Sequence, residues 1–139
     1  MLDNPRIRTP LAISLGAIAG ALCRYFVGHW VTAFISPEFP LGTMVVNLSG
    51  CFLMGWVTTL AGGRRSIQPD LLLMATTGFL GSYTTFSSYE LDAVTLFTSE
   101  SLKGDLLYWM GSPLLGFLCL LAGATVAAIA NPPSSDDQD

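Results

Sequence analysis

Four long apolar stretches account for most of this 139-residue chain and leave little room for anything else. A helix needs about 20 consecutive apolar residues to cross the hydrocarbon core of a bilayer. Each stretch is long enough for one crossing, so we predict an all-α integral membrane protein with one four-span domain over residues 1–130. The tail, residues 131–139, is polar and acidic, and we predict that it is disordered. The predicted spans cover residues of about 11–34, 41–61, 71–97 and 106–130.

The composition excludes the main soluble classes. Hydrophobic residues make up 51% of the chain and charged residues only 12%, whereas about 25% of a soluble domain is charged. Ten acidic residues against six basic ones leave no basic surface for nucleic acid. The three cysteines are scattered through apolar runs without a CxxC or Cys/His spacing, so neither a disulfide framework nor a metal site is indicated.

Basic residues in the short connections predict the orientation. With four spans, Arg6, Arg8, Arg64 and Arg65 lie on one side of the membrane, and only Lys103 lies on the other. Because lysine and arginine are enriched in cytoplasmic loops, this distribution places both termini in the cytoplasm.

Arg24 is the one basic side chain well inside a predicted span. Gly16, Gly20, Arg24 and Gly28 recur every four residues and so share one helix face, and the first two form a GxxxG pair that favours close helix packing. An arginine at this depth is costly. It could set a positive potential beside an anion path, fix an interface by bonding carbonyl groups, or extend to the membrane edge.

Two other spans carry polar stripes. Thr43 and Asn47 lie one turn apart on the second span, followed by Gly50. An amide inside a membrane must be hydrogen-bonded, so Asn47 faces either a wet path or another helix. Tyr108 and Ser112 form a similar stripe on the fourth span.

The third span is the most informative, because residues 78–90 read GFLGSYTTFSSYE. A run so rich in hydroxyl groups and glycine is poor material for a continuous lipid-facing helix and predicts a helix break. Carbonyl groups freed at a break can coordinate a hard cation such as Na⁺, and the following helix N-terminus can face an anion. Phe86 and Tyr89 are three residues apart, so their rings point the same way and offer positive edges to a small anion.

Three of these segments resemble the Fluc (CrcB) fluoride channels. The segments are GALCRY at 20–25, GTMVVNLSG at 42–50 and GFLGSYTTFS at 78–87, and the resemblance covers essentially the whole chain. It implies a four-span subunit whose third helix is broken near its middle, paired in an antiparallel, dual-topology dimer. It also implies two fluoride pores, a central structural Na⁺ that is not transported, and passive export of fluoride.

The resemblance also implies roles for individual residues. The backbone carbonyls of Gly81 and Thr84 would bind Na⁺, and Arg24 would be a structural basic residue. Asn47 would be the pore amide and Phe86 the first ring of an aromatic box, whose second ring, usually phenylalanine, is Tyr89 here. The fluoride path would comprise Thr43, Asn47, Phe86, Ser87, Tyr89, Tyr108 and Ser112.

One chain has too few helices to enclose a path, so we expect an oligomer. The partner is either a second copy in antiparallel orientation or an oppositely oriented paralogue, which the uneven loop charge would favour. We expect a multi-pass protein of a bacterial cell membrane, with fluoride and the lipid bilayer as partners and no enzymatic activity. A small four-span multidrug exporter, which needs a carboxylate within the membrane, and a non-transporting assembly subunit are the alternatives.

Overall fold

The computed structural model describes residues 4–35, 39–63, 67–97 and 102–132, and this part of the chain is helical and contains no strand. Three helices are long and apolar enough to cross a membrane: α1, α2 and, from Asp105 onward, α6. The predicted all-α membrane class is therefore confirmed. In chain order the elements are α1 (Pro5–Phe34), α2 (Leu41–Gly62), α3 (Pro69–Leu73), the π-helix η1 (Met74–Leu80), α4 (Gly81–Tyr83), α5 (Phe86–Phe97) and α6 (Leu102–Ala130).

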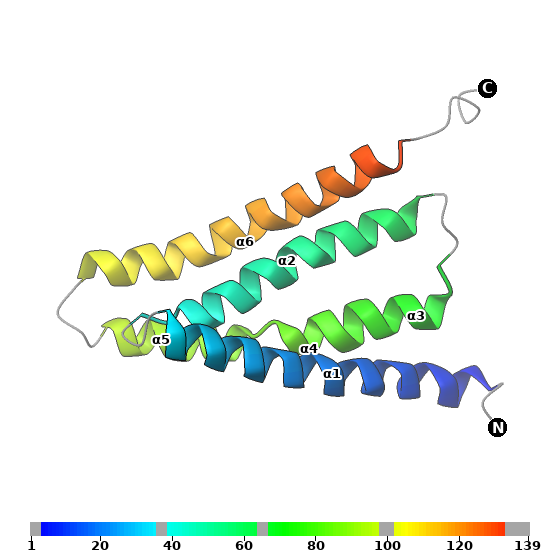
Figure 1. Ribbon diagram of the computed structural model, residues 1–139, viewed down its shortest axis with the longest axis horizontal. Coiled ribbons are helices and arrows are strands. Elements are labelled where there is room, and N and C mark those ends of the chain that lie inside the picture. Colours follow the sequence, from blue (N-terminus) through cyan, green and yellow to red (C-terminus); the bar gives the residue numbers. More distant parts are fainter. Residues whose placement is uncertain (1–3, 36–38, 64–66, 98–101, 133–139) are drawn as a thin grey trace.

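The helices lie roughly side by side, as Figure 1 shows. The start of α1, the end of α2, the start of α3 and the end of α6 are all on the right of that view. α2 packs mainly along α6, and α1 packs mainly along η1. Arg64, Arg65, the side chain of Lys103 and the tail segment 133–139 lie outside the described residues, so the charge bias and the disordered tail stay predictions.

The first helix begins earlier than the apolar pattern indicates. Pro5 occupies its first turn, and the side chain of Asn4 accepts a hydrogen bond of 3.0 Å from the Arg6 N–H, which caps the helix. Pro10 lies inside α1, just before the predicted span of about 11–34. At that position it removes one helical hydrogen bond, to the Arg6 carbonyl, close to the helix end.

Glycines allow α1 and η1 to approach at backbone distance. A Cβ at Gly16 would overlap the carbonyl oxygen of Met74, and one at Gly20 would overlap that of Phe79. A Cβ at Gly78, on η1, would lie 3.1 Å from the Cα of Gly16. The close packing predicted for the GxxxG pair is confirmed, and it places Arg24 one turn beyond the contact.

The outward faces of the bundle are strongly apolar. Phe34, Leu107 and Ile129 are each 75% exposed, and many other large apolar side chains are exposed around them. A water-facing monomer rarely shows so much contiguous apolar surface. Such faces suit contact with lipid or with another membrane-embedded chain.

Candidate functional site

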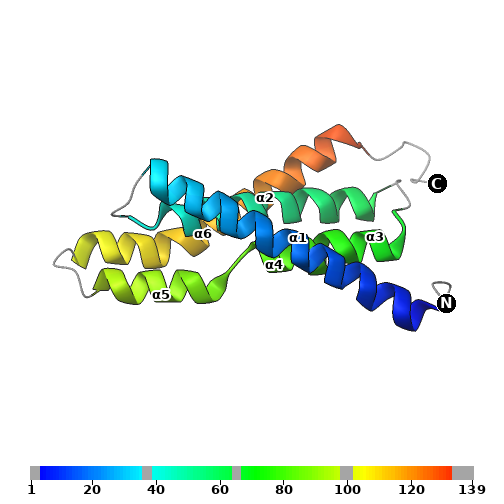
Figure 2. The ribbon, with the colours of Figure 1, turned by 60° about the horizontal axis from the view of Figure 1, so that its bottom comes forward.

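A two-residue link separates α4 from α5 and is visible as an extended segment in Figure 2. α4 ends at Tyr83, Thr84 has the extended ψ of 157°, and α5 begins at Phe86. This link lies within the hydroxyl-rich run of residues 82–89. Its backbone groups must therefore find partners other than the next helical turn.

Asn47 on α2 holds both backbone groups of Thr85. Its Nδ2 donates to the Thr85 carbonyl at 2.9 Å, and its Oδ1 accepts from the Thr85 N–H at 2.8 Å. Two near-ideal hydrogen bonds tie one side chain to a single peptide position. α2 thus fixes the position of the link relative to the rest of the bundle.

The Thr85 side chain starts the next helix. Its Oγ1 accepts from the Ser88 N–H at 3.1 Å, the bond of a threonine N-cap. The same oxygen lies 3.2 Å from the Ser87 hydroxyl and 3.1 Å from the Ser88 hydroxyl. Thr85 is only 8% exposed, whereas Ser88 is half-buried and Ser87 is exposed, so this small hydroxyl network runs from the interior to the surface of the subunit.

These contacts divert two N–H groups that a continuous helix would use. In an α-helix the carbonyls of Gly81 and Thr84 would accept from the N–H groups of Thr85 and Ser88. Here the first donates to Asn47 and the second to the Thr85 side chain. Both carbonyls that the resemblance assigns to Na⁺ are thereby released from helical bonding, and oxygen is the ligand type that hard cations prefer.

Two further observations bear on a cation at this place. Within the described ranges no group of three or more His, Cys, Asp or Glu side chains could hold a metal ion. Arg24 Nη1 also lies 3.4 Å from the Thr84 carbonyl oxygen, at the long end of hydrogen-bonding distance. The predicted structural arginine therefore reaches the link itself.

A cavity of about 350 Å³ opens beside the link. Of the predicted site residues it brings together Asn47 from α2, Thr84 from the link, Phe86 and Tyr89 from α5, and Ser112 from α6. The Ser112 hydroxyl is buried without a hydrogen-bond partner among the described residues. The other lining residues are Cys51, Thr85, Pro113, Gly116, Phe117 and Leu120.

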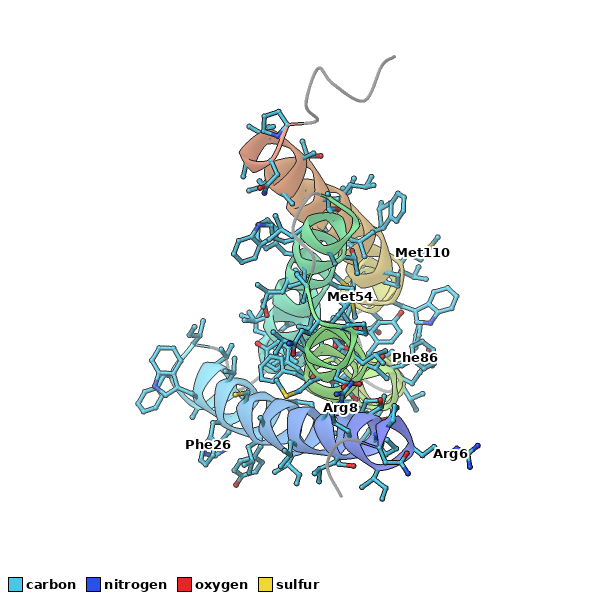
Figure 3. The ribbon with its side chains drawn as sticks, turned by 90° about the vertical axis from the view of Figure 1, so that its right-hand side faces the viewer. Arg6, Arg8, Phe26, Met54, Phe86 and Met110 are labelled. Carbon is cyan, nitrogen blue, oxygen red and sulfur yellow. The ribbon has the colours of Figure 1, made fainter. Side chains whose placement is uncertain are left out.

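The two predicted rings are neighbours at this cavity. Their centroids are 5.7 Å apart and their planes are tilted by 44°. Tyr89 is 6% exposed, whereas Phe86 is 73% exposed and points away from the bundle in Figure 3. One ring is thus held inside the subunit and the other is presented to whatever surrounds it.

A second cavity, of about 400 Å³, lies on the side of α1. It contains the predicted residues Arg24 and Thr43, together with His29 and Ser88. Thr85 lines both cavities, so the link forms part of the wall between them. The remaining lining residues are Ala21, Tyr25, Gly28, Gly42 and Val46.

Tyr108 and Ser87 line neither cavity. Tyr108 is 3% exposed, and its ring lies 5.6 Å from that of Tyr89. Its hydroxyl donates to the Asp92 carboxylate at 3.3 Å. Ser87 contacts the Thr85 hydroxyl at the edge of the link. Both residues therefore support cavity-lining residues in this subunit.

A polar contact joins the first turns of α1 and α3. Asp70 accepts from the Thr9 hydroxyl at 2.6 Å and forms an ion pair with Arg8. Arg8 lies between the two helices in Figure 3, whereas Arg6 points away. The hydrogen bond from Thr9 and the neighbouring guanidinium together hold the pKa of Asp70 below its ordinary value. This carboxylate stays charged at neutral pH and ties α3 to α1.

Reasoning from sequence missed two residues of this region. Thr85 is the centre of the link, but it lies in a run of hydroxyl residues that gives no signal for one member over another. No site role is predicted for His29, yet it lines the second cavity beside Arg24. The sequence signal for His29 is its four-residue spacing from Tyr25, which places both residues on one face of α1. Their rings are stacked, with centroids 6.0 Å apart.

The fold and these cavities define a class: multi-pass helical membrane proteins with a polar, interrupted segment inside an apolar bundle. The chain belongs to the CrcB-like protein family (Camphor Resistance, CrcB), which matches residues 11–124. It is 45% identical over 126 residues to a protein of Synechococcus sp. named fluoride-specific ion channel FluC, covering 91% of this chain and 97% of that one.

Other relatives carry the same name. One from Trichormus variabilis is 46% identical over 88% of this chain and 90% of its own length. One from Synechocystis sp. is 43% identical over 87% of this chain and 93% of its own length. The similarity is nearly end to end, and with the apolar helices it makes the chain a multi-pass protein of the cell membrane.

Proposed function

We propose that this protein is a fluoride-selective ion channel that exports fluoride passively from the cytoplasm and so lowers its toxicity. The observation that carries the proposal is the near-complete match, at 45% identity, to a relative named for fluoride-specific conduction. The cavity beside the link supports it chemically. It combines an amide, the two threonines of the link, a buried serine hydroxyl and aromatic rings in a space whose other lining residues are mainly apolar.

Fluoride is small and strongly hydrated, so a selective path must replace its water with donors at short range. In this proposal Asn47, Ser112 and Thr43 supply N–H and O–H donors, and Phe86 and Tyr89 supply positive ring edges. Arg24 adds a positive potential from the second cavity, close to the link. Chloride is larger, and the same donors would not converge on it.

The proposal includes a structural cation at the link. Na⁺ would be held by the carbonyls of Gly81 and Thr84, and by the same two groups of a second subunit. The diverted N–H groups support this assignment, because they leave both oxygens without their helical donors. A bound cation would neutralise these oxygens and hold the link in its extended form.

We further propose that α3, η1, α4 and α5 together cross the membrane as one broken span. The span would run over residues 71–97, as predicted from the sequence, and Asp70 would lie outside it at the membrane edge. Phe86 would then complete its box against an antiparallel partner, which its 73% exposure supports. The partner is a second copy of this chain or an oppositely oriented paralogue.

Ion efflux from liposomes that contain only this chain tests the function. We expect fluoride efflux with little chloride efflux, and the same protein should conduct without a second gene product if it pairs with itself. Equal efflux of the two anions would contradict selectivity. No anion efflux would favour a non-transporting subunit, and proton-coupled movement of organic cations would favour the exporter.

Replacing Na⁺ tests the cation. When N-methylglucamine replaces Na⁺ on both sides of the membrane, we expect the dimer to dissociate more readily and fluoride efflux to fall. Thr84→Ser should have little effect on either readout, because the proposed ligands are backbone carbonyls and not the Thr84 side chain. Indifference of both assembly and efflux to Na⁺ would remove the cation from the proposal.

A further inference from the structure

One hydrogen bond, from α5 to the backbone of α6, plays no part in the fluoride path proposed above. The Tyr89 hydroxyl donates to the carbonyl oxygen of Trp109. Tyr89 is 6% exposed, so the residue that donates this bond is buried in the subunit. The hydroxyl is the very group by which this residue differs from the phenylalanine usual in the resembling family.

The carbonyl that accepts this bond is one that its own helix cannot satisfy. In an α-helix, the Trp109 carbonyl would accept from the N–H of residue 113. Residue 113 is proline and lies inside α6, so it has no N–H to donate. The Tyr89 hydroxyl therefore supplies the hydrogen bond that Pro113 removes.

The same bond fixes the far end of the ring. Tyr89 is anchored at its Cα by α5 and at its hydroxyl by α6, and its ring lies between Phe86 at 5.7 Å and Tyr108 at 5.6 Å. Tyr89 and Pro113 also line the same cavity. A ring held at both ends keeps its edge in one direction, whereas a phenylalanine would be held only by packing.

We propose that Tyr89 is a positioning residue that acts through its hydroxyl, satisfying the carbonyl orphaned by Pro113 and thereby holding its own ring edge toward the cavity. Tyr89 and Pro113 then form an energetically coupled pair across two helices. The part concerning ring position rests on the proposed function, and the part concerning the carbonyl does not.

A double-mutant cycle separates the two parts. The variants are Tyr89→Phe, Pro113→Ala and the combination, each purified as the full chain, with thermal unfolding and fluoride efflux per channel as readouts. Tyr89→Phe should lower the unfolding midpoint by about 4 °C or more when Pro113 is present, the shift expected from one unsatisfied group. It should leave the midpoint unchanged when residue 113 is alanine, because the new N–H bonds the Trp109 carbonyl.

Conduction should respond differently. Tyr89→Phe should slow fluoride efflux about threefold to tenfold in both backgrounds, since alanine at 113 satisfies the carbonyl but does not hold the ring. A purely structural hydroxyl would leave the efflux of folded channels unchanged, and that result overturns the positioning role. Equal falls in the midpoint with and without Pro113 overturn the coupling, whether or not the protein conducts fluoride.

Tyr108→Phe provides the matched control. Its hydroxyl donates to Asp92 rather than to an α6 carbonyl, so its effect on the midpoint should be the same with proline or alanine at 113. Coupling of equal size for Tyr108 and Tyr89 would mean that Pro113→Ala rearranges α6 generally, and the specific pairing would be withdrawn.

Discussion

The glycine contact between α1 and η1 offers the sharpest test of the fold, through the substitution Gly20→Ala. A Cβ at this position would lie 2.9 Å from the carbonyl carbon of Phe79 and 3.1 Å from its Cα, with the carbonyl oxygen closer still. Ordinary contact begins at 3.4 Å, and the oxygen is the closest of the three atoms, so α1 and η1 must separate by about one ångström or more. All three opposing atoms belong to the backbone, and no side-chain rotation relieves the overlap.

The expected size follows from two opposing effects. Alanine is favoured over glycine inside a helix by about 1 kcal/mol. Overpacking a close contact costs about 1–3 kcal/mol, and a rigid backbone neighbour places this case at the upper end. We therefore expect Gly20→Ala to lower the free energy of unfolding by about 2 kcal/mol.

Gly28→Ala is the matched control on the same helix. No heavy atom lies within 4 Å of a Cβ at Gly28, so only the helix propensity acts and the variant should be neutral or slightly more stable. The two substitutions make the same chemical change to α1. A difference of about 3 kcal/mol between them therefore measures the helix contact alone.

Unfolding in mixed micelles at increasing SDS concentration, followed by tryptophan fluorescence, gives these free energies. Fluoride efflux per channel should also fall for Gly20→Ala, because moving α1 carries Arg24 away from the Thr84 carbonyl. If Gly20→Ala proved as stable as Gly28→Ala, α1 and η1 would not be in backbone contact and the packing described here would be refuted.

Three further outcomes are expected. Phe86→Ile keeps apolar bulk but removes the ring edge, so fluoride efflux should be abolished while circular dichroism and gel-filtration volume stay unchanged; retained efflux would exclude the ring edge. Asn47→Asp places an oxygen opposite the Thr85 carbonyl and should lower the free energy of unfolding in SDS by about 1–3 kcal/mol. An unchanged free energy of unfolding would contradict the two hydrogen bonds between Asn47 and Thr85. The Thr9 hydrogen bond and Arg8 lower the pKa of Asp70 in the folded protein. Their contact with Asp70 should therefore stabilise the folded protein above the ordinary aspartate pKa of 3.8, and this stabilisation should be lost as pH falls through the lower folded pKa. The unfolding midpoint of Asp70→Asn should not show this fall at low pH. An identical pH profile of the midpoint for both proteins would rule out a stabilising contact of Asp70 with Thr9 and Arg8.

The predictable part of this structure is the part governed by apolar length and residue spacing. Continuous apolar runs indicated the helices, and the four-residue glycine spacing indicated the face that packs closely. The first apolar run begins near residue 11, whereas the Asn4 cap and Pro5 begin the helix itself earlier. Local capping decided that boundary, and hydropathy does not report it.

The unpredicted part depends on partners that are distant in sequence. Nothing in MATTGFL signals a π-helix over Met74–Leu80; its glycine contacts with α1 exist only in the folded bundle. The hydroxyl of Tyr89 had no assigned partner, although a proline inside a helix always leaves one carbonyl unbonded four residues earlier. The roles of the cavity residues in conduction stay predictions.

The two hydrogen bonds between Asn47 and Thr85 fix the orientation of the Asn47 amide. Turning the amide over would oppose its NH₂ group to the Thr85 N–H and its oxygen to the Thr85 carbonyl, so a single orientation is allowed. One hydrogen of the NH₂ group is used in that orientation, and one is left over. The remaining hydrogen therefore points in one fixed direction, while the oxygen uses one of its two lone pairs for the Thr85 N–H. Along the proposed fluoride path, a donor held in this way would meet the anion without having to turn, whereas a free amide or a water molecule must reorient for each ion that passes.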